Sequence, residues 1–346
     1  SYVGSEFVYG ELGILGSGAY GEILPKGTNT IIFAFQVLPT IVFIATLFGV
    51  LYYLGVMQAI VRVMAKAMVY LFGVSGAEAL AVAASVFMGQ SEAPLTIRPY
   101  LARLTASELF CVVVAGMASV SGAILAAYVA IGGVKMAHLL TVVAMTAPIS
   151  LVMAKVMVPE TETPETAGVV KAAPIENSAN VLDAAANGAS DGLKLAVNVG
   201  AMLIAFIALV SLLNAILGVI PTGGDPLTLE RILGWLFSPL ALLMGIPWAE
   251  AQTVGSILGT RTVVNEIVAY QQLHEAKAIL SERSVAIATF AVCGFANLGS
   301  IGIQIGGLGA LVPERKSDIA RIGVLALIAA TLANFSSACI AGALMR

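Results

Sequence analysis

The sequence predicts an all-α integral membrane protein. We expect an inverted repeat in which each copy holds a re-entrant helical hairpin, an interrupted transmembrane helix and a transmembrane helix, with scaffold helices beside them. Three observations predict this fold. Hydrophobic residues make up 59% of the 346 residues and charged residues only 11%, whereas soluble domains carry about 25% charged residues. Uncharged runs long enough to cross a bilayer recur along the chain. Two further apolar segments are each broken in the middle by polar residues.

The same composition excludes several classes of function. So few charged residues cannot coat the surface of a soluble enzyme of this length. The net charge is −3, and the Lys and Arg residues are scattered rather than clustered. A nucleic-acid partner is therefore not expected. The partner that the composition indicates is the lipid bilayer.

Taken in order, the elements divide the chain into six parts. Residues 1–30 are predicted as an N-terminal interfacial segment, and 31–72 as a scaffold transmembrane helix followed by an amphipathic interfacial helix. The first repeat is 73–154, a polar cytoplasmic linker is 155–192, a second scaffold helix is 193–224, and the second repeat is 225–346. Six bilayer crossings are expected, from four long uncharged runs and two shorter ones: 31–61, 109–134, 195–224, 284–313, 136–154 and 322–345.

Each predicted hairpin has a polar break. Segment 75–104 is broken at 89–94 by Gly-Gln-Ser-Glu-Ala-Pro, and segment 233–280 is broken at 259–266 by Gly-Thr-Arg-Thr-Val-Val-Asn-Glu. The halves are too short to cross alone, so each segment is predicted to enter the membrane and return. Non-helical backbone at that depth is tolerated where protein or a watery cavity surrounds it.

A repeated pattern follows the hairpins. The span after the first contains Gly116-Met-Ala-Ser119, and the span after the second contains Gly294-Phe-Ala-Asn297. Inverted repeats with discontinuous helices are typical of secondary transporters, which bind substrate near the midplane. Of the 17 Lys and Arg residues, ten fall on the predicted linker side and six on the other, with Arg261 at a hairpin break left out. This bias makes the linker side cytoplasmic.

Two carboxylates stand at the hairpin breaks. An unpaired acid at the centre of a membrane helix costs about 2.5 to 3.5 kcal/mol, so Glu92 and Glu266 indicate a site where the two polar breaks face each other. The alternative is that they lie at the interface or form structural ion pairs with Arg98 and Arg261. Glu78, Glu108 and His138 lie near the ends of membrane elements and are predicted to be interfacial rather than catalytic.

The interrupted helices add hydroxyl and amide groups. Ser119 and Ser121 in the first, with Asn297 and Ser300 in the second, lie beside glycines that weaken the helix and free backbone carbonyls for a cation. The alternative is that small residues here only allow close helix packing. Phe295 is a candidate for stacking on a planar ring.

Three motifs carry a resemblance to a known family. The motifs are Gly-Gln-Ser-Glu-Ala-Pro at 89–94, Asn-Glu-Ile-Val-Ala-Tyr at 265–270 and Cys-Gly-Phe-Ala-Asn at 293–297. With these motifs in this order, the chain resembles the concentrative nucleoside transporters over nearly its whole length. The resemblance implies a homotrimer in which each protomer has its own site. It also implies cation-driven nucleoside uptake, with a transport domain that moves like an elevator against a fixed scaffold.

The resemblance also assigns residues. The first-hairpin residues would face the nucleobase, with an apolar wall beside it from the interrupted helix: Gln90, Ser91, Glu92 and Ile124. The ribose would be bound from the second hairpin and its following helix, with Phe295 beside the substrate: Glu266, Asn297 and Ser300. A sodium site would use two hydroxyls and two main-chain carbonyls: Ser85, Ser119, Met88 and Val120.

Two departures from the family stand out. The family commonly has Asn where this chain has Ser85. The Ser85 hydroxyl can still serve as an oxygen ligand for sodium, but the change leaves proton coupling through Glu92 open. Sodium remains the expected coupling ion, and no other cofactor is expected. The family also usually has transmembrane helices before the segment that begins here, so the chain is expected to be short or truncated.

The resulting hypothesis is a sodium-driven nucleoside symporter, multi-pass in a bacterial inner membrane. A proton-coupled symporter and a carrier of the same architecture for another small polar or anionic solute are the alternatives. A membrane-embedded enzyme or channel is a third class, which the lack of a hydrolytic triad and of a continuous polar stripe disfavours.

Overall fold

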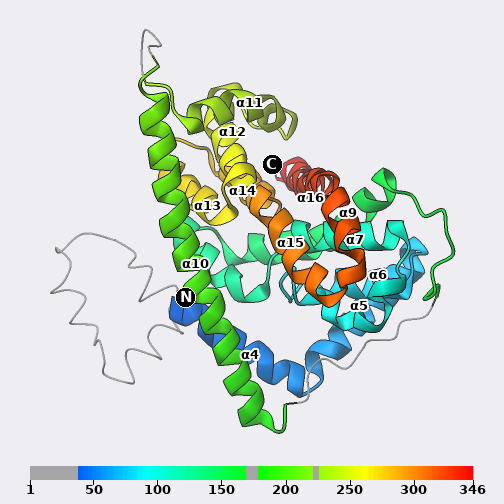
Figure 1. Ribbon diagram of the computed structural model, residues 1–346. Helices are drawn as coiled ribbons and strands as arrows, with labels where there is room; N and C mark the ends of the chain where they lie inside the picture. The colour runs from blue at the N-terminus through cyan, green and yellow to red at the C-terminus, as the bar shows by residue number, and fades with distance from the viewer. Residues whose placement is uncertain (1–37, 169–177, 221–225, 346) are drawn as a thin grey trace.

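Helices make up most of the computed structural model, which describes residues 38–168, 178–220 and 226–345 (Figure 1). The all-helical class predicted from composition is confirmed. The predicted interfacial segment 1–30 lies outside the described residues, as does the start of the first predicted crossing.

The described chain begins with a bent pair of helices. Helix α4 (Leu38–Tyr53) meets α5 (Val56–Phe72) at an angle of 77°. Gly55 makes the turn with a φ of 78°, a backbone conformation that residues with a Cβ rarely adopt. Helix α5 is amphipathic, as its sequence predicts. It buries four residues at helical spacing and leaves Arg62 and Lys66 exposed.

The first hairpin and the first interrupted helix follow. Helix α6 (Gly76–Ala84) leads through a turn into the 3₁₀ segment η1 (Ala93–Arg103). Helix α7 (Ala106–Ala118) then stops at Ser119, whose backbone is extended. The chain resumes as η2 (Gly122–Ile124) and α8 (Leu125–Gly132), and α9 (Met136–Met157) returns. The interruption thus falls where the glycine and serine pattern predicts it.

Helix α10 (Val181–Leu217) packs closely along α4. A Cβ on Gly188 would lie 2.7 Å from the Ala45 carbonyl oxygen, and one on Gly49 would lie 2.8 Å from the Ala184 oxygen. Small residues therefore bring the two backbones together. The helix begins at its Asn180 cap, inside the segment 155–192 predicted as a polar linker, because the Ala-rich stretch there is a good helix former.

The second half of the chain repeats the order of the first. Helices α11 (Leu229–Leu243) and α12 (Trp248–Val263) meet at 117°, and α13 (Glu266–Ala276) follows a break of two residues. The break is shorter than the predicted 259–266, since α12 continues through Gly259. Helix α14 (Glu282–Val292) ends at Cys293, α15 (Leu298–Leu311) resumes, and η3 (Pro313–Arg315) leads into α16 (Lys316–Leu344).

Fewer uninterrupted spans appear than the six crossings predicted. Among the described residues three stretches are long and apolar enough to cross a membrane, Ala106–Gly132, Met136–Met157 and Pro313–Leu344, or five if each bent pair counts as one span. Two of the three crossings not found are explained by breaks, because the predicted span 284–313 is divided into α14 and α15 and because α4 turns sharply into α5. The third, 195–224, falls on α10, where the apolar stretch found among the described residues is the shorter Ile207–Leu217.

Both repeats join the start of a hairpin helix to the start of the interrupted helix through a serine cap and an acid, with the two roles exchanged. In the first, the Ser75 hydroxyl, the cap of α6, donates to Glu108 in the first turn of α7, 2.5 Å away. In the second, Glu250 in the first turn of α12 accepts from the hydroxyl of Ser281, the cap of α14, at 3.1 Å.

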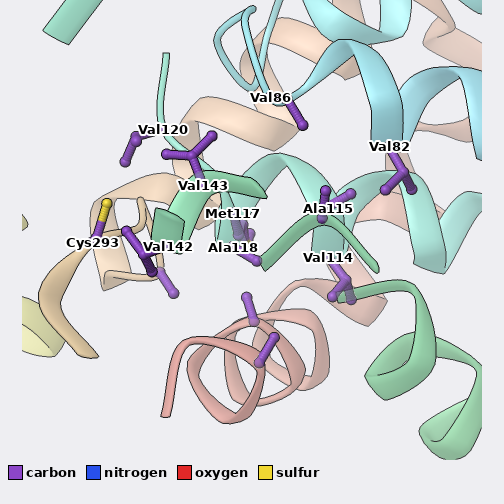
Figure 2. Close-up of a cluster of buried hydrophobic side chains, with 14 of the residues drawn as sticks. Val82, Val86, Val114, Ala115, Met117, Ala118, Val120, Val142, Val143 and Cys293 are labelled. Atoms are coloured by element: carbon purple, nitrogen blue, oxygen red, sulfur yellow. The ribbon is translucent and has the colours of Figure 1, made fainter. Parts of the chain in front are cut away.

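The core gathers around the two helix breaks. Figure 2 shows Val82 and Val86 of the first hairpin, Val120 of the first break and Cys293 of the second break in one buried apolar cluster. Helix α16 packs against α7, α9 and α14, so it lies behind both interrupted helices.

Glu78 and Glu108 lie at helix starts, as predicted, and each side chain is buried in the protein and only 1% exposed. Each completes a capping box with the residue before its helix, Ser75 or Thr105. The Lys155 ammonium lies 2.7 Å from the Glu78 carboxylate. The paired lysine is what allows the Glu78 charge to be buried.

Candidate functional site

Three helices begin at the breaks, and each begins with a polar cap. The Asn265 side chain accepts from the backbone N–H of Val268 at 2.9 Å and starts α13. Asn297 does the same for Ser300 at 3.0 Å and starts α15, while Ser121 caps η2. These caps satisfy backbone donors that the breaks would leave orphaned. They also fix Glu266 as the first residue of its helix.

The Glu266 carboxylate is bound from both repeats. One oxygen accepts from the Tyr128 hydroxyl at 3.1 Å, and the other accepts from the Asn297 side-chain amide at 3.1 Å. The Tyr128 ring stacks on Tyr270 with centroids 4.6 Å apart, and Glu266 is only 4% exposed. A buried, oriented carboxylate with two polar neighbours is suited to binding hydroxyl groups.

Gln90 brings the first hairpin into the same arrangement. Its amide nitrogen donates to the Ser300 hydroxyl at 3.3 Å, and its oxygen accepts from Gln304 at 3.4 Å. Gly116 makes room for this contact, since a Cβ there would lie 2.5 Å from the Gln304 amide nitrogen. Hydrogen bonds therefore link Gln90, Ser300, Asn297 and Glu266 in a chain across both repeats, which we name the polar bridge.

The other predicted substrate residues are not part of the polar bridge. Ser91 is exposed and its hydroxyl faces Gly307 of α15. The Glu92 carboxylate turns back and accepts from the Gly89 N–H at 3.2 Å. Ile124 is buried just after the first break. Phe295 is half-buried in the second break, where its N–H donates to the Ser119 carbonyl at 3.3 Å.

The predicted sodium ligands come from two neighbouring segments. Gly122, just after the first break, donates its N–H to the Phe87 carbonyl at 3.1 Å, so the turn that carries Met88 lies against the break that carries Val120. The Ser85 and Ser119 hydroxyls are both buried, and each donates its proton to a carbonyl of its own helix, at 2.8 and 2.6 Å. Their oxygen lone pairs remain available as ligands.

A buried amide on α16 joins the two helix breaks. The Asn334 amide nitrogen donates to the Ala118 carbonyl at 2.8 Å and to the Cys293 carbonyl at 2.9 Å, which are the last residues before the two breaks. Its oxygen accepts from Arg261, which also donates to Thr331 at 3.1 Å. Arg261 is 0% exposed and interacts electrostatically with Glu266, so it supplies a buried countercharge without a direct salt bridge.

Sequence reasoning missed several of these polar partners. Gln304 stands four residues after Ser300, and Tyr128 four residues after Ile124, so the helical i, i+4 spacing was a signal for both. Asn334 is a single amide within the apolar run 322–345, which is itself a sign of a packed polar contact.

Two family models match this chain. The model described as "Na+ dependent nucleoside transporter C-terminus" matches residues 138–342, and the model described as "Nucleoside recognition" matches residues 34–135. The two matches together cover both halves of the polar bridge and both helix breaks.

Similar proteins occur in bacteria and mammals. The chain is 42% identical over 348 residues to "Nucleoside permease NupC" of Helicobacter pylori, covering 99% of this chain and 81% of the relative. It is 47% identical over 326 residues to "Uncharacterized transporter YutK" of Bacillus subtilis, covering 93% and 80%. With human "Solute carrier family 28 member 3" it shares 42% identity over 331 residues, 90% of this chain and 48% of that protein.

Solved structures agree with the arrangement described above. The chain superposes on CNTnw in an inward-facing substrate-bound state with a TM-score of 0.87 and 44% identity, covering 97% of this chain and 82% of that one. An outward-facing state of a CNTnw variant gives a TM-score of 0.90, with coverage of 98% and 80%.

Proposed function

Since this chain belongs to the concentrative nucleoside transporter family, it is a nucleoside transporter and not an enzyme, and we propose that it is a sodium-driven symporter. The observation that carries the proposal is the polar bridge. It joins the first hairpin to the second repeat through side chains with both donors and acceptors. Such a set suits an uncharged, polyhydroxylated solute better than an ion.

The ribose half of the substrate would bind at Glu266 and Asn297. A ribose has two adjacent hydroxyls, and the carboxylate accepts from them while the amide accepts and donates. Ser300 lies one hydrogen bond further along. Tyr128 holds the second Glu266 oxygen at 3.1 Å, so the carboxylate keeps its orientation when Asn297 exchanges its bond for one to the substrate.

The nucleobase half would bind toward the first hairpin. Gln90 is held at both ends of its amide and offers a donor and an acceptor to a base edge. Ile124 would supply an apolar wall, Phe295 an aromatic neighbour, and Ser91 and Glu92 further polar contacts. A base needs such an apolar slot with few, well-placed polar groups.

Sodium would bind between the hairpin turn and the first break. The Ser85 and Ser119 hydroxyls with the Met88 and Val120 carbonyls give four oxygens, to which a water adds a fifth. Sodium is a hard cation that prefers oxygen ligands, and the close contact of the two segments through Gly122 and Phe87 supports this placement. Under the alternative, proton coupling, Glu92 would carry the proton.

The proposal extends to assembly and movement. The structures that this chain resembles include inward-facing and outward-facing states of CNTnw, which supports an alternating-access mechanism of the elevator type. The pair α4 and α10 would belong to the fixed scaffold, and the two hairpins with the interrupted helices would move. The working form would be a homotrimer in a bacterial inner membrane.

Transport assays in liposomes test the proposal. Purified protein is reconstituted, and uptake of radiolabelled uridine and adenosine is measured with sodium and proton gradients imposed separately. Saturable uptake that follows the sodium gradient is expected. Uptake that persists without sodium and rises with external acidification would replace sodium with protons, and no nucleoside uptake under either gradient would refute the proposal.

A further inference from the structure

A basic cavity lies where the end of the second hairpin meets the first repeat. It has a volume of about 410 Å³ and is lined by the turn between α8 and α9, the turn between α13 and α14, the first two turns of α14 and the residue after α16. None of the described residues in its lining belongs to the polar bridge or is assigned above to nucleoside or sodium. The cavity is therefore separate from the site already described.

The lining contains more positive than negative side chains. Its cations are Lys135 before α9, Lys277 after α13 and Arg283 in the first turn of α14, and its carboxylate is that of Glu282. Among the described residues, none of these cations forms an ion pair. The cavity thus holds an excess of positive charge that the described part of the chain leaves uncompensated.

Two of the cations also have a structural role. The Lys277 ammonium donates to the Gly133 carbonyl at 2.5 Å, and the Arg283 guanidinium donates to the carbonyls of Gly245 and Gly342 at 2.6 and 2.8 Å. These carbonyls lie at the C-terminal ends of α8, α11 and α16, where the helix dipole favours a cation. Each side chain still has N–H donors to spare, because an ammonium has three and a guanidinium five.

Lys135 has no such structural role. Its side chain is exposed and forms no hydrogen bond with the described residues. Lys135 is the N-cap of α9, where the helix dipole disfavours a cation, and it shares the cavity with two other positive side chains. A bound anion would turn each of these unfavourable interactions into a favourable one.

A phosphate group suits this cavity better than a carboxylate. Its oxygens accept from several charged donors at once, and the cavity presents the whole ammonium of Lys135 with the spare donors of Lys277 and Arg283. The lining also contains apolar side chains that suit the carbon chain of a phosphate ester: Val134, Leu280 and Val285. Basic pockets between membrane helices bind anionic lipid headgroups in this way.

We propose that this cavity binds an anionic phosphate group, carried by a lipid headgroup or free in solution, and that Lys135 recognises it. The bound phosphate joins the start of α9 to the end of the second hairpin, because Lys135 precedes α9 and Lys277 follows α13. The inference does not depend on the proposed function, since binding is measured without nucleoside.

Thermal unfolding of the purified chain in detergent measures this binding, because a ligand of the folded state raises the Tm. One probe is dioctanoyl phosphatidylglycerol, compared with dioctanoyl phosphatidylcholine, whose choline cation offsets the phosphate charge. The other probe is sodium phosphate, compared with sodium chloride of equal ionic strength. A rise in Tm with phosphatidylglycerol alone assigns the site to a lipid headgroup, and a rise with sodium phosphate as well assigns it to phosphate itself. The inference is overturned if neither probe raises the Tm above its control.

Variants of Lys135 separate recognition from a structural role. Lys135→Gln should raise the apparent Kd of the effective probe about fivefold, the effect of one basic residue near an anionic surface. Lys135→Glu should abolish the stabilisation by the probe, yet its Tm without added anion should be unchanged or higher, because an acid at a helix N-terminus is favourable. Lys66→Gln, which removes an exposed charge from α5, should keep the Kd of the parent.

Two results with these variants would overturn the inference. The first is a Lys135→Glu protein that the probe stabilises as strongly as the parent, since the cavity would then bind without its recognition residue. The second is an equal rise in Kd for Lys135→Gln and Lys66→Gln, since the response would then follow the overall charge of the protein rather than this cavity.

Discussion

Replacing Asn334 by Leu should destabilise the protein by removing a buried amide of α16 that bonds to three groups. The side chain is 0% exposed and bonds to the carbonyls of Ala118 and Cys293 and to the Arg261 guanidinium. Leu has a similar volume, so the change removes the polar bonds with little loss of packing. It leaves two carbonyls and one charged group without their partner.

The magnitude follows from these three bonds. A buried group left unpaired costs about 1 to 3 kcal/mol, and more when it is charged. Individual side-chain hydrogen bonds inside membrane proteins average only about 0.6 kcal/mol, and Arg261 keeps its bond to Thr331. We therefore expect a decrease of about 3 kcal/mol in the free energy of unfolding. Gly294 adds to this, because it leaves no room for rearrangement: a Cβ there would already overlap the Asn334 amide.

Unfolding in mixed detergent micelles measures the decrease, with Ser337→Ala as the matched control. Ser337 lies on the same helix, is equally buried, and contributes one neutral bond to Ala333 at 3.1 Å and a contact with Thr146 at 3.2 Å. The control should lose about 1 kcal/mol. If Asn334→Leu is no less stable than Ser337→Ala, the argument that this amide holds the two helix breaks together is refuted.

Three further predictions test the site and its support. Glu266→Gln should weaken ribonucleoside binding by about 1.5 to 3 kcal/mol, through loss of a charged acceptor, and affect deoxyribose analogues less; equal uridine affinity by calorimetry would remove Glu266 from the ribose site. Ser119→Ala should raise the sodium concentration for half-maximal uptake, and an unchanged value would exclude its hydroxyl as a ligand. Lys155→Met should lower the free energy of unfolding by about 3 to 5 kcal/mol, because Glu78 is left as an unpaired buried charge. As a control, Lys194→Met removes the exposed ion pair of Lys194 with Asp191 and should lower the free energy of unfolding by less than about 1 kcal/mol. Equal losses of stability in Lys155→Met and Lys194→Met would contradict the argument.

The helix breaks could be predicted from the sequence because their chemistry is local. Gly116 and Ser121, like Gly294 and Asn297, combine a weak helix former with a capping side chain a few residues later. The structure shows a second role for the two glycines, close packing against distant side chains, which no local sequence pattern indicates. Gly116 admits Gln304 and Gly294 admits Asn334, and both amides come from helices distant in the chain.

The two hairpin acids look equivalent in the sequence but differ in the fold. Glu266 begins α13 directly after its Asn265 cap, and is buried between Tyr128 and Asn297. Glu92 lies in the turn before η1, where its side chain bends back to Gly89 and lines a cavity beside α4 and α10. The distinction depends on what packs against each break, which hydropathy and spacing do not encode.

Sodium-driven accumulation of uridine tests the central claim most directly. Liposomes that contain the parent protein are loaded with potassium, placed in sodium medium with labelled uridine, and compared with liposomes that have equal sodium on both sides. The account predicts that internal uridine rises above the external concentration only under the inward sodium gradient, and that Glu266→Gln reduces this accumulation. Uridine that never exceeds the external concentration, under any sodium gradient, would contradict it.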